Sequence, residues 1–215
     1  KKEEKLHIAQ LLDEAGVHRI EAGMPVVSAE DADAVKAIAH AGLKAKIFGF
    51  CRMVKGDIDA AIRSDVRGVI IEGPVGVPKL KQFGWPYDEV VRKAIEAVDY
   101  AKAHGLQAAF FTVDVTRAEL SFIKRLLSEI GTQTKVDSFI LADTFGCTLP
   151  EAIAYLVREL KKTVKQPLEM HCHNDFGLGT ACTLAGIAAG AEVAHTSVNG
   201  IGERTGNVSF EEVVM

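Results

Sequence analysis

Residues 137–175 read DSFILADTFGCTLPEAIAYLVRELKKTVKQPLEMHCHND. An apolar run at 137–142 is followed by a turn, by a segment with helical spacing at 149–164, and by a second apolar run at 167–171. Short apolar runs bounded by turns predict strands, and apolar residues three and four positions apart predict an amphipathic helix. This stretch therefore predicts one strand–helix–strand unit of a parallel sheet.

The same alternation extends along the chain. Seven runs predict strands, at 17–22, 45–50, 68–72, 107–113, 137–142, 167–171 and 192–198. Helices are expected at 3–15, 29–40, 87–104, 117–130, 149–164 and 177–189. Ser28 and Asp57 stand where side chains cap helix starts, and Pro150 stands where a helix opens. Alternating strands and helices favour a mainly parallel α/β sheet, either open and doubly wound or closed as a barrel.

Polar residues at the ends of the predicted strands favour the barrel. No glycine-rich phosphate loop follows any strand, as a doubly wound nucleotide fold would require. Polar side chains at many strand ends are typical of a (β/α)8 TIM barrel, and here they are Glu21, Arg52, Glu72, Asp114, Asp143, His171 and Asn199. Such a barrel needs eight strands. We therefore expect a single catalytic barrel domain over residues 1–215, with its first strand missing from this sequence and incomplete at the C-terminus as well.

Composition narrows the function classes. The chain has 215 residues, is 48% hydrophobic and carries a net charge of −4, with 25 Lys and Arg against 29 Asp and Glu. Without a basic cluster it is not expected to bind nucleic acid, and without a long apolar run or a signal peptide it is not expected to enter a membrane. The four cysteines form no CxxC pair and are expected to be small buried residues, so the expected location is the cytoplasm.

Three motifs at the predicted strand ends carry candidate chemistry. In extended chain His171 and His173 point to one face, which suits a divalent metal, although a pair of hydrogen-bonded strand-end histidines fits the spacing too. Asp143 and Thr144 predict a hydroxyl and backbone N–H for a substrate carboxylate, or an ordinary turn. The loop 199–207, NGIGERTGN, has three glycines for tight turns or close approach of a ligand, or is simply mobile.

These motifs together resemble the family of 2-isopropylmalate, homocitrate and citramalate synthases, which is related to 3-hydroxy-3-methylglutaryl-CoA (HMG-CoA) lyase. The resemblance runs from IEAGMP at 20–25 through DTFG at 143–146 and HCHNDFGLG at 171–179 to the loop 199–207 and EEVVM at 211–215. The sequence GERTGN at 202–207 resembles the synthases more than the lyases.

The resemblance implies a metal-dependent acyltransferase that condenses acetyl-CoA with a small 2-oxo acid. It implies His171, His173 and Asn207 as ligands of Mg²⁺, Mn²⁺ or Zn²⁺, together with a carboxylate of the missing first strand. Thr144, Arg52 and Asp143 are implied as substrate-binding residues, and Glu21 and Glu203 as catalytic residues, with Glu21 orienting an arginine of the first strand. Family members tend to be dimers, so a homodimer is expected.

Two departures from the family pattern bear on the substrate. Val113 stands where synthases usually carry a glutamate before Asp114, and residues 72–78, EGPVGVP, stand where the family rim usually has Thr-Ser and a histidine. In addition, Ala109-Phe110-Phe111 stands where homocitrate-type members tend to place an arginine for a second carboxylate, which favours a monocarboxylic 2-oxo acid. Two alternatives stay open at this point, namely an HMG-CoA lyase-like carbon–carbon lyase and a non-catalytic barrel that binds a 2-oxo acid.

Overall fold

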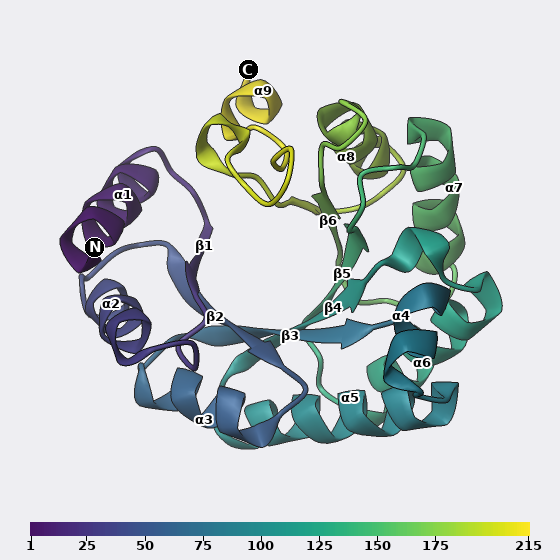
Figure 1. Ribbon diagram of the computed structural model, residues 1–215, viewed down its shortest axis with the longest axis horizontal. Coiled ribbons are helices and arrows are strands. Elements are labelled where there is room, and N and C mark those ends of the chain that lie inside the picture. The colour runs from purple at the N-terminus through teal and green to yellow at the C-terminus, as the bar shows by residue number, and fades with distance from the viewer. The chain divides into compact units, whose positions relative to one another are not determined.

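The computed structural model describes residues 1–215 and contains nine α-helices, seven strands and two short 3₁₀ turns (Figure 1). The strands are β1 (Arg19–Gly23), β2 (Lys46–Arg52), β3 (Gly68–Pro74), β4 (Gln107–Val113), β5 (Ser138–Asp143), β6 (Leu168–Cys172) and β7 (Val193–Ala194). The helices are α1 (Lys2–Glu14), α2 (Ala29–Ala39), α3 (Lys55–Arg63), α4 (Val77–Phe83), α5 (Tyr87–Ala103), α6 (Leu120–Gln133), α7 (Pro150–Lys161), α8 (Gly179–Ala188) and α9 (Phe210–Val214). The 3₁₀ turns are Val115–Arg117 and Val198–Gly200.

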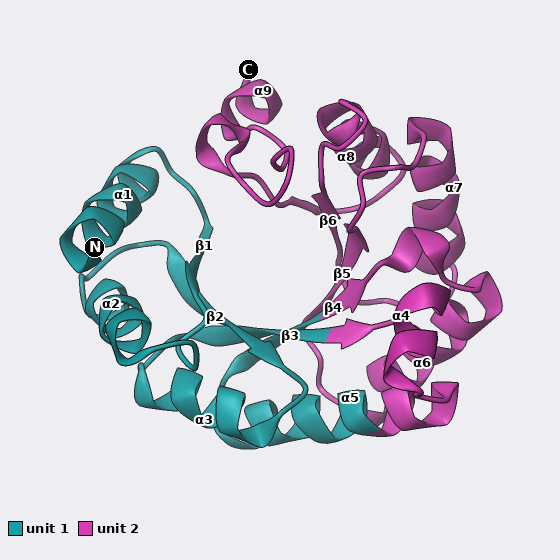
Figure 2. Cartoon of the chain, viewed as in Figure 1, with its two compact units in different colours: residues 1–72, 93–110 teal, residues 73–92, 111–215 magenta.

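All seven predicted strands are present, and they follow one another in sequence order within one sheet. The pairs β1–β2, β2–β3, β5–β6 and β6–β7 are parallel, as strand–helix–strand units require. The chain divides into two compact units (Figure 2). Unit 1 comprises residues 1–72 and 93–110, and unit 2 comprises residues 73–92 and 111–215.

Unit 1 is built on β1 and β2, with α1 packed beside α2 and both helices against β1 (Figure 1). Ser28 caps α2 as predicted, because its hydroxyl accepts a hydrogen bond from the Asp31 backbone N–H. Helix α2 and strand β2 supply buried apolar side chains such as Val35 and Ile47. Burying a side chain of this size stabilises a fold by roughly 1.5–3 kcal/mol, so these contacts hold the helices on the strands.

Unit 2 contains β5, β6 and the helices α6 to α9. Every residue of β5 is buried, which is typical of a parallel strand covered on both faces. Helix α7 packs on α8, and α8 packs on β6. Pro150 stands in the first turn of α7, where its missing N–H leaves no helical hydrogen bond unmade, as the sequence predicts.

Three details differ from the sequence prediction. Helices α3 and α4 are additional to the helices expected from the sequence. Asp57 does not cap α3, because the cap position is Val54 and the Asp57 carboxylate is held by Arg52 instead. Strand β7 has only two residues, because the chain leaves β6 and the Ser197 N–H donates to the carbonyl of Val208. No helix combines the length and apolar character that crossing a membrane requires.

A substitution at Gly68, the first residue of β3, tests how tightly unit 1 is packed. A Cβ on Gly68 would lie 2.5 Å from Cε1 of Phe48 and 2.8 Å from the Gln107 carbonyl oxygen, so Gly68→Ala is expected to destabilise the protein by about 1–3 kcal/mol. The control is Gly56→Ala in α3, where a Cβ meets no atom within 4 Å and should be neutral or stabilising by up to about 1 kcal/mol. Urea unfolding measures both, and equal stability of the two variants would contradict this account.

Candidate active site

The carboxyl end of β5 places Asp143 at the base of the candidate site in unit 2. Its side chain is 1% exposed, and its carboxylate accepts a hydrogen bond from the Thr116 hydroxyl at 2.9 Å. The backbone N–H of Thr148 donates to the same carboxylate at 3.3 Å. Because these donors hold the Asp143 carboxylate in place, they fix the turn that carries Thr144.

Thr144 is oriented by a backbone contact. Its hydroxyl oxygen accepts a hydrogen bond of 2.8 Å from the N–H of Asp114. A hydroxyl that accepts one bond can still donate its own proton. The hydroxyl proton of Thr144 is therefore suited to an acceptor such as a carboxylate oxygen.

Strand β6 brings the two histidines beside this turn. Parallel pairing sets Ala142 opposite His171, and the N–H of His173 donates to the Asp143 carbonyl at 3.1 Å. The rings of His171 and His173 stand nearly edge to face with their centroids 5.2 Å apart. The predicted sharing of one strand face is therefore confirmed for this pair.

Both imidazoles are held in the neutral form. Burial is the main cause that brings the pKa of His171 well below its ordinary value, and the neighbouring His195 and His173 lower it further. Burial also lowers the pKa of His173, with the Arg204 guanidinium as the next cause. A neutral imidazole nitrogen carries the lone pair that metal ligation requires.

The glycine-rich loop brings Asn207 to the histidines. Asn207 and His173 form an isolated antiparallel bridge, and the Asn207 side-chain nitrogen lies 3.3 Å from Nε2 of His171. A Cβ at position 202 would collide with the Asn207 side chain, so glycine there leaves Asn207 in its place. Gly206 adopts a φ of +101°, which side-chain-bearing residues rarely reach. The loop geometry therefore serves the placement of Asn207.

Arg204 ties the same loop to its surroundings. Its guanidinium donates to both carboxylate oxygens of Asp175 at 2.8 Å and to the Thr144 carbonyl at 2.6 Å. The guanidinium lies 5.5 Å from the centre of the Phe145 ring. Glu203 is largely exposed, with its carboxylate 3.6 Å from Arg204. The loop is thus fastened to the turn after β5 and to the segment after β6.

The donor set of His171, His173 and Asn207 fits a divalent cation. Nδ1 of each histidine is buried without a hydrogen-bond partner, and two neutral imidazoles with a side-chain amide can provide three ligands. The cluster contains no third His, Cys, Asp or Glu side chain. These residues would therefore supply part of a coordination sphere, with neutral donors only.

The other predicted site residues, Glu21 and Arg52, lie in unit 1. Glu21 is exposed in β1, next to an irregularity in its pairing with β2. Arg52 donates through Nε and Nη2 to the Asp57 carboxylate at 2.7 and 3.0 Å, and Asp57 is 2% exposed. Arg52 is thus engaged in an ion pair within its own unit, and its substrate-binding role stays a prediction.

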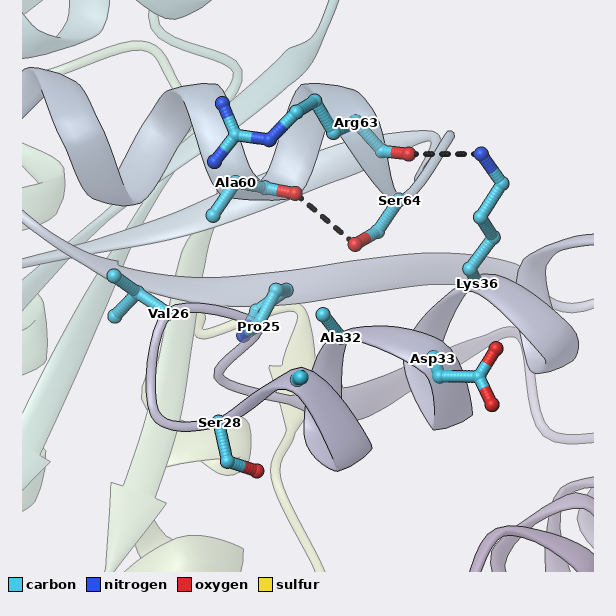
Figure 3. Close-up of a pocket in the computed structure, with 10 residues that line it drawn as sticks. Pro25, Val26, Ser28, Ala32, Asp33, Lys36, Ala60, Arg63 and Ser64 are labelled. Atoms are coloured by element: carbon cyan, nitrogen blue, oxygen red, sulfur yellow. Dashed lines mark hydrogen bonds between the residues drawn. The ribbon is translucent and has the colours of Figure 1, made fainter.

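Unit 1 also contains a cavity that is lined by none of the predicted site residues. It lies between the loop before α2, α2 itself and α3 (Figure 3). Figure 3 shows Lys36 donating to the Arg63 carbonyl and the Ser64 hydroxyl donating to the Ala60 carbonyl. These contacts pair the Lys36 amine and the Ser64 hydroxyl of the wall with backbone carbonyls of α3.

The cysteines follow the prediction at three positions of four. Cys51, Cys172 and Cys182 are buried, and burial raises the pKa of Cys172 to about 12. Cys147 is exposed, so its predicted burial is wrong, because it lies in the segment between β5 and α7 rather than in a strand or helix. A raised thiol pKa makes the buried cysteines poor nucleophiles at neutral pH.

The structure contains one pair beside the histidines that the sequence motifs do not include. Nε2 of His195 lies 2.6 Å from the carboxylate of Glu169, a residue of β6 with 1% exposure. A charged residue inside an otherwise apolar strand, two positions before His171, is a sequence signal for this pair. The signal names Glu169 but not its partner, which lies 26 residues away in sequence.

The fold is that of an α/β barrel of the kind found in HMG-CoA lyases. The structure matches the HMG-CoA lyase of Bacillus subtilis with a TM-score of 0.85 over 99% of this chain and 77% of that one, at 17% sequence identity. At this identity the match shows the fold alone, and it confirms the predicted fold class.

The chain belongs to the HMGL-like family, which it matches over residues 1–215. It is 44% identical to homocitrate synthase AksA of Methanothermobacter thermautotrophicus over 99% of this chain and 54% of the relative. It is 43% identical to a putative (R)-citramalate synthase CimA of Methanosarcina mazei over 100% of this chain and 44% of the relative. The chain thus spans about half the length of these relatives, and the predicted family is confirmed.

The ion pair of Arg204 predicts a pH-dependent contribution to stability. Hydrogen bonding to Arg204 is the main cause that lowers the pKa of Asp175 below its ordinary value of 3.8. A lowered carboxyl pKa contributes stability above the unfolded pKa and loses it as the pH falls through the folded pKa. Arg204→Gln is therefore expected to lose about 1 kcal/mol above about pH 4, because the pair is partly exposed and screened by solvent.

Urea unfolding between pH 2.5 and pH 7 measures the difference in the free energy of unfolding between Arg204→Gln and the unsubstituted protein. The difference should shrink as the pH falls below 3.8. Arg158→Gln is the control, because Arg158 is exposed on α7. A loss in Arg204→Gln that stays constant down to pH 2.5 would contradict the assigned role of the Asp175 carboxylate.

Proposed function

We propose that the protein is a metal-dependent acyltransferase that condenses acetyl-CoA with a small 2-oxo acid. The observation that carries the proposal is the meeting of His171, His173 and Asn207 beside the oriented hydroxyl of Thr144. Relatives named homocitrate and citramalate synthase, at 43–44% identity, support the reaction class. In this reaction the methyl carbon of acetyl-CoA, after losing a proton, bonds to the 2-oxo carbon, and water then releases CoA from the thioester.

His171, His173 and Asn207 would hold a divalent metal such as Mg²⁺, Mn²⁺ or Zn²⁺. When bound, the metal would polarise the 2-oxo carbonyl and stabilise the negative charge that develops on its oxygen. The burial that keeps both imidazoles neutral supports this assignment, because a protonated histidine cannot act as a ligand.

Thr144 and Asp143 are proposed to position the substrate. The Thr144 hydroxyl accepts from the Asp114 N–H, which leaves its proton for the substrate carboxylate. The Asp143 carboxylate is surrounded by protein donors and acts by holding the turn, so its contribution to substrate binding is indirect. We retain Glu21 and Glu203 as proposed catalytic residues, and both carry exposed carboxylates.

The substrate is proposed to be a 2-oxo monocarboxylic acid. Phe111 packs edge to face on His171, with ring centroids 4.9 Å apart. An aromatic wall against the histidine offers no charge to a second carboxylate. The two nearby arginines of unit 2, Arg117 and Arg204, are each paired with an aspartate. A homodimer and a cytoplasmic location remain predictions from the sequence.

Release of CoA tests the proposal. The full-length protein with acetyl-CoA and Mn²⁺ is expected to release free thiol in the presence of one oxo acid from a panel of pyruvate, 2-oxoisovalerate, 2-oxoglutarate and oxaloacetate. His171→Ala should lower the rate at least about 100-fold, since partners outside the ligand sphere alone account for about 10- to 100-fold. His7→Ala, at an exposed position on α1, is the matched control and should keep the full rate.

Each outcome of this assay assigns a function. Release that requires one monocarboxylic oxo acid and disappears in His171→Ala supports the synthase. A requirement for 2-oxoglutarate or oxaloacetate would overturn the substrate class but keep the reaction. No release with any oxo acid, together with cleavage of HMG-CoA, would replace the proposal with a carbon–carbon lyase.

Removal of metal gives a separate prediction. Treatment with EDTA followed by gel filtration should abolish CoA release, and adding Mn²⁺ or Mg²⁺ should restore it, because His171, His173 and Asn207 offer only neutral donors and hold no positive charge of their own. Unchanged release after chelation, with metal content checked by mass spectrometry, would remove the metal from the proposal.

A further inference from the structure

A buried acid–histidine pair lies directly beside the proposed metal ligands. Glu169 stands two residues before His171 in β6, so both side chains point to the same face of the strand. The Glu169 carboxylate is 2.6 Å from Nε2 of His195, and the two side chains are 1% and 13% exposed. The backbone N–H of His195 donates to the Met170 carbonyl at 2.8 Å, which holds His195 against β6.

The His195 ring contacts His171. Their centroids are 5.5 Å apart and their planes cross at 81°, while Phe111 packs edge to face on His171 at 4.9 Å. Edge-to-face packing of rings at these separations restricts how the packed ring can turn. The orientation of His171 therefore depends on His195, whose own ring is held by Glu169.

Stability alone is a weak explanation for this arrangement. Replacing a buried ion pair by apolar side chains of similar volume is often neutral or stabilising. The pair also interrupts an otherwise apolar stretch of β6, whose neighbouring residues Leu168 and Met170 are fully buried. A role at the adjacent site accounts for its position.

We propose that Glu169 and His195 are positioning residues for the metal site: His195 fixes the ring of His171, and Glu169 holds the ring of His195. The proposal rests on the metal site of the proposed function. It goes beyond it by assigning a role to two residues outside the ligand set.

Calorimetric titration with Mn²⁺ alone tests the proposal in the full-length protein, without substrate or turnover. Glu169→Gln keeps the shape of the side chain and removes its charge, and it is expected to weaken Mn²⁺ binding about 10- to 100-fold. His195→Gln can still hydrogen-bond to Glu169 but lacks the ring, and it should also weaken binding. The matched control is Glu192→Gln, which removes an exposed carboxylate paired with Lys161 and should bind within about twofold of the unsubstituted protein.

Circular dichroism identifies the folded variants before titration, because a merely structural role would lower the melting temperature without changing the affinity of folded protein. If Glu169→Gln does not fold, His195→Gln decides the test. Affinities of the folded variants within about twofold of Glu192→Gln would overturn the inference and leave the proposed function intact. Failure of the unsubstituted protein to bind Mn²⁺ would overturn the inference together with the metal assignment.

Discussion

Parallel pairing of β5 with β6 sets Ala142 opposite His171 and Asp143 opposite Cys172, and the N–H of His173 extends the pairing to the Asp143 carbonyl. The candidate site depends on this register. A slip by one residue would move the histidines to the opposite face of the sheet and bring Cys172 to the site. The burial of every side chain in β5 makes such a slip costly, since it would place polar groups in an apolar layer.

The loop 199–207 adds a ligand that no strand could provide. Its chain turns back so that Asn207 bridges His173 and the Asn174 N–H donates to the Gly206 carbonyl. The loop needs left-handed backbone at Gly200 and Gly206, and Arg204 adopts a positive φ of 57° as well. A residue with a side chain is strained in that region, and the bidentate pair of Arg204 with Asp175 offsets the strain. Gly200 and Gly206 thus allow the loop to turn, and the ion pair of Arg204 with Asp175 holds it in place.

The sequence predicted the local features and missed the long-range ones. The strands follow from short apolar runs between turns, and the face shared by His171 and His173 follows from the period of two residues in a strand. Both patterns involve only residues close together in sequence. The pairs Glu169–His195 and Arg204–Asp175 join residues 26 and 29 positions apart, so no local pattern reveals them. Asp57 shows the opposite failure, because its position near a helix start suggested a cap while an ion pair with Arg52 took its carboxylate.

The arginines at the strand ends limit how a substrate carboxylate can be bound. Arg52 is paired with Asp57, which is 2% exposed, and Arg117 with Asp114, which is fully buried. Moving either guanidinium onto a substrate would leave a buried carboxylate unpaired, at a cost of about 3–5 kcal/mol. These arginines are therefore better suited to holding the chain after β2 and β4 than to exchanging partners during turnover. Within unit 2, recognition of a carboxylate then falls to neutral donors, of which the Thr144 hydroxyl is already oriented by the Asp114 N–H.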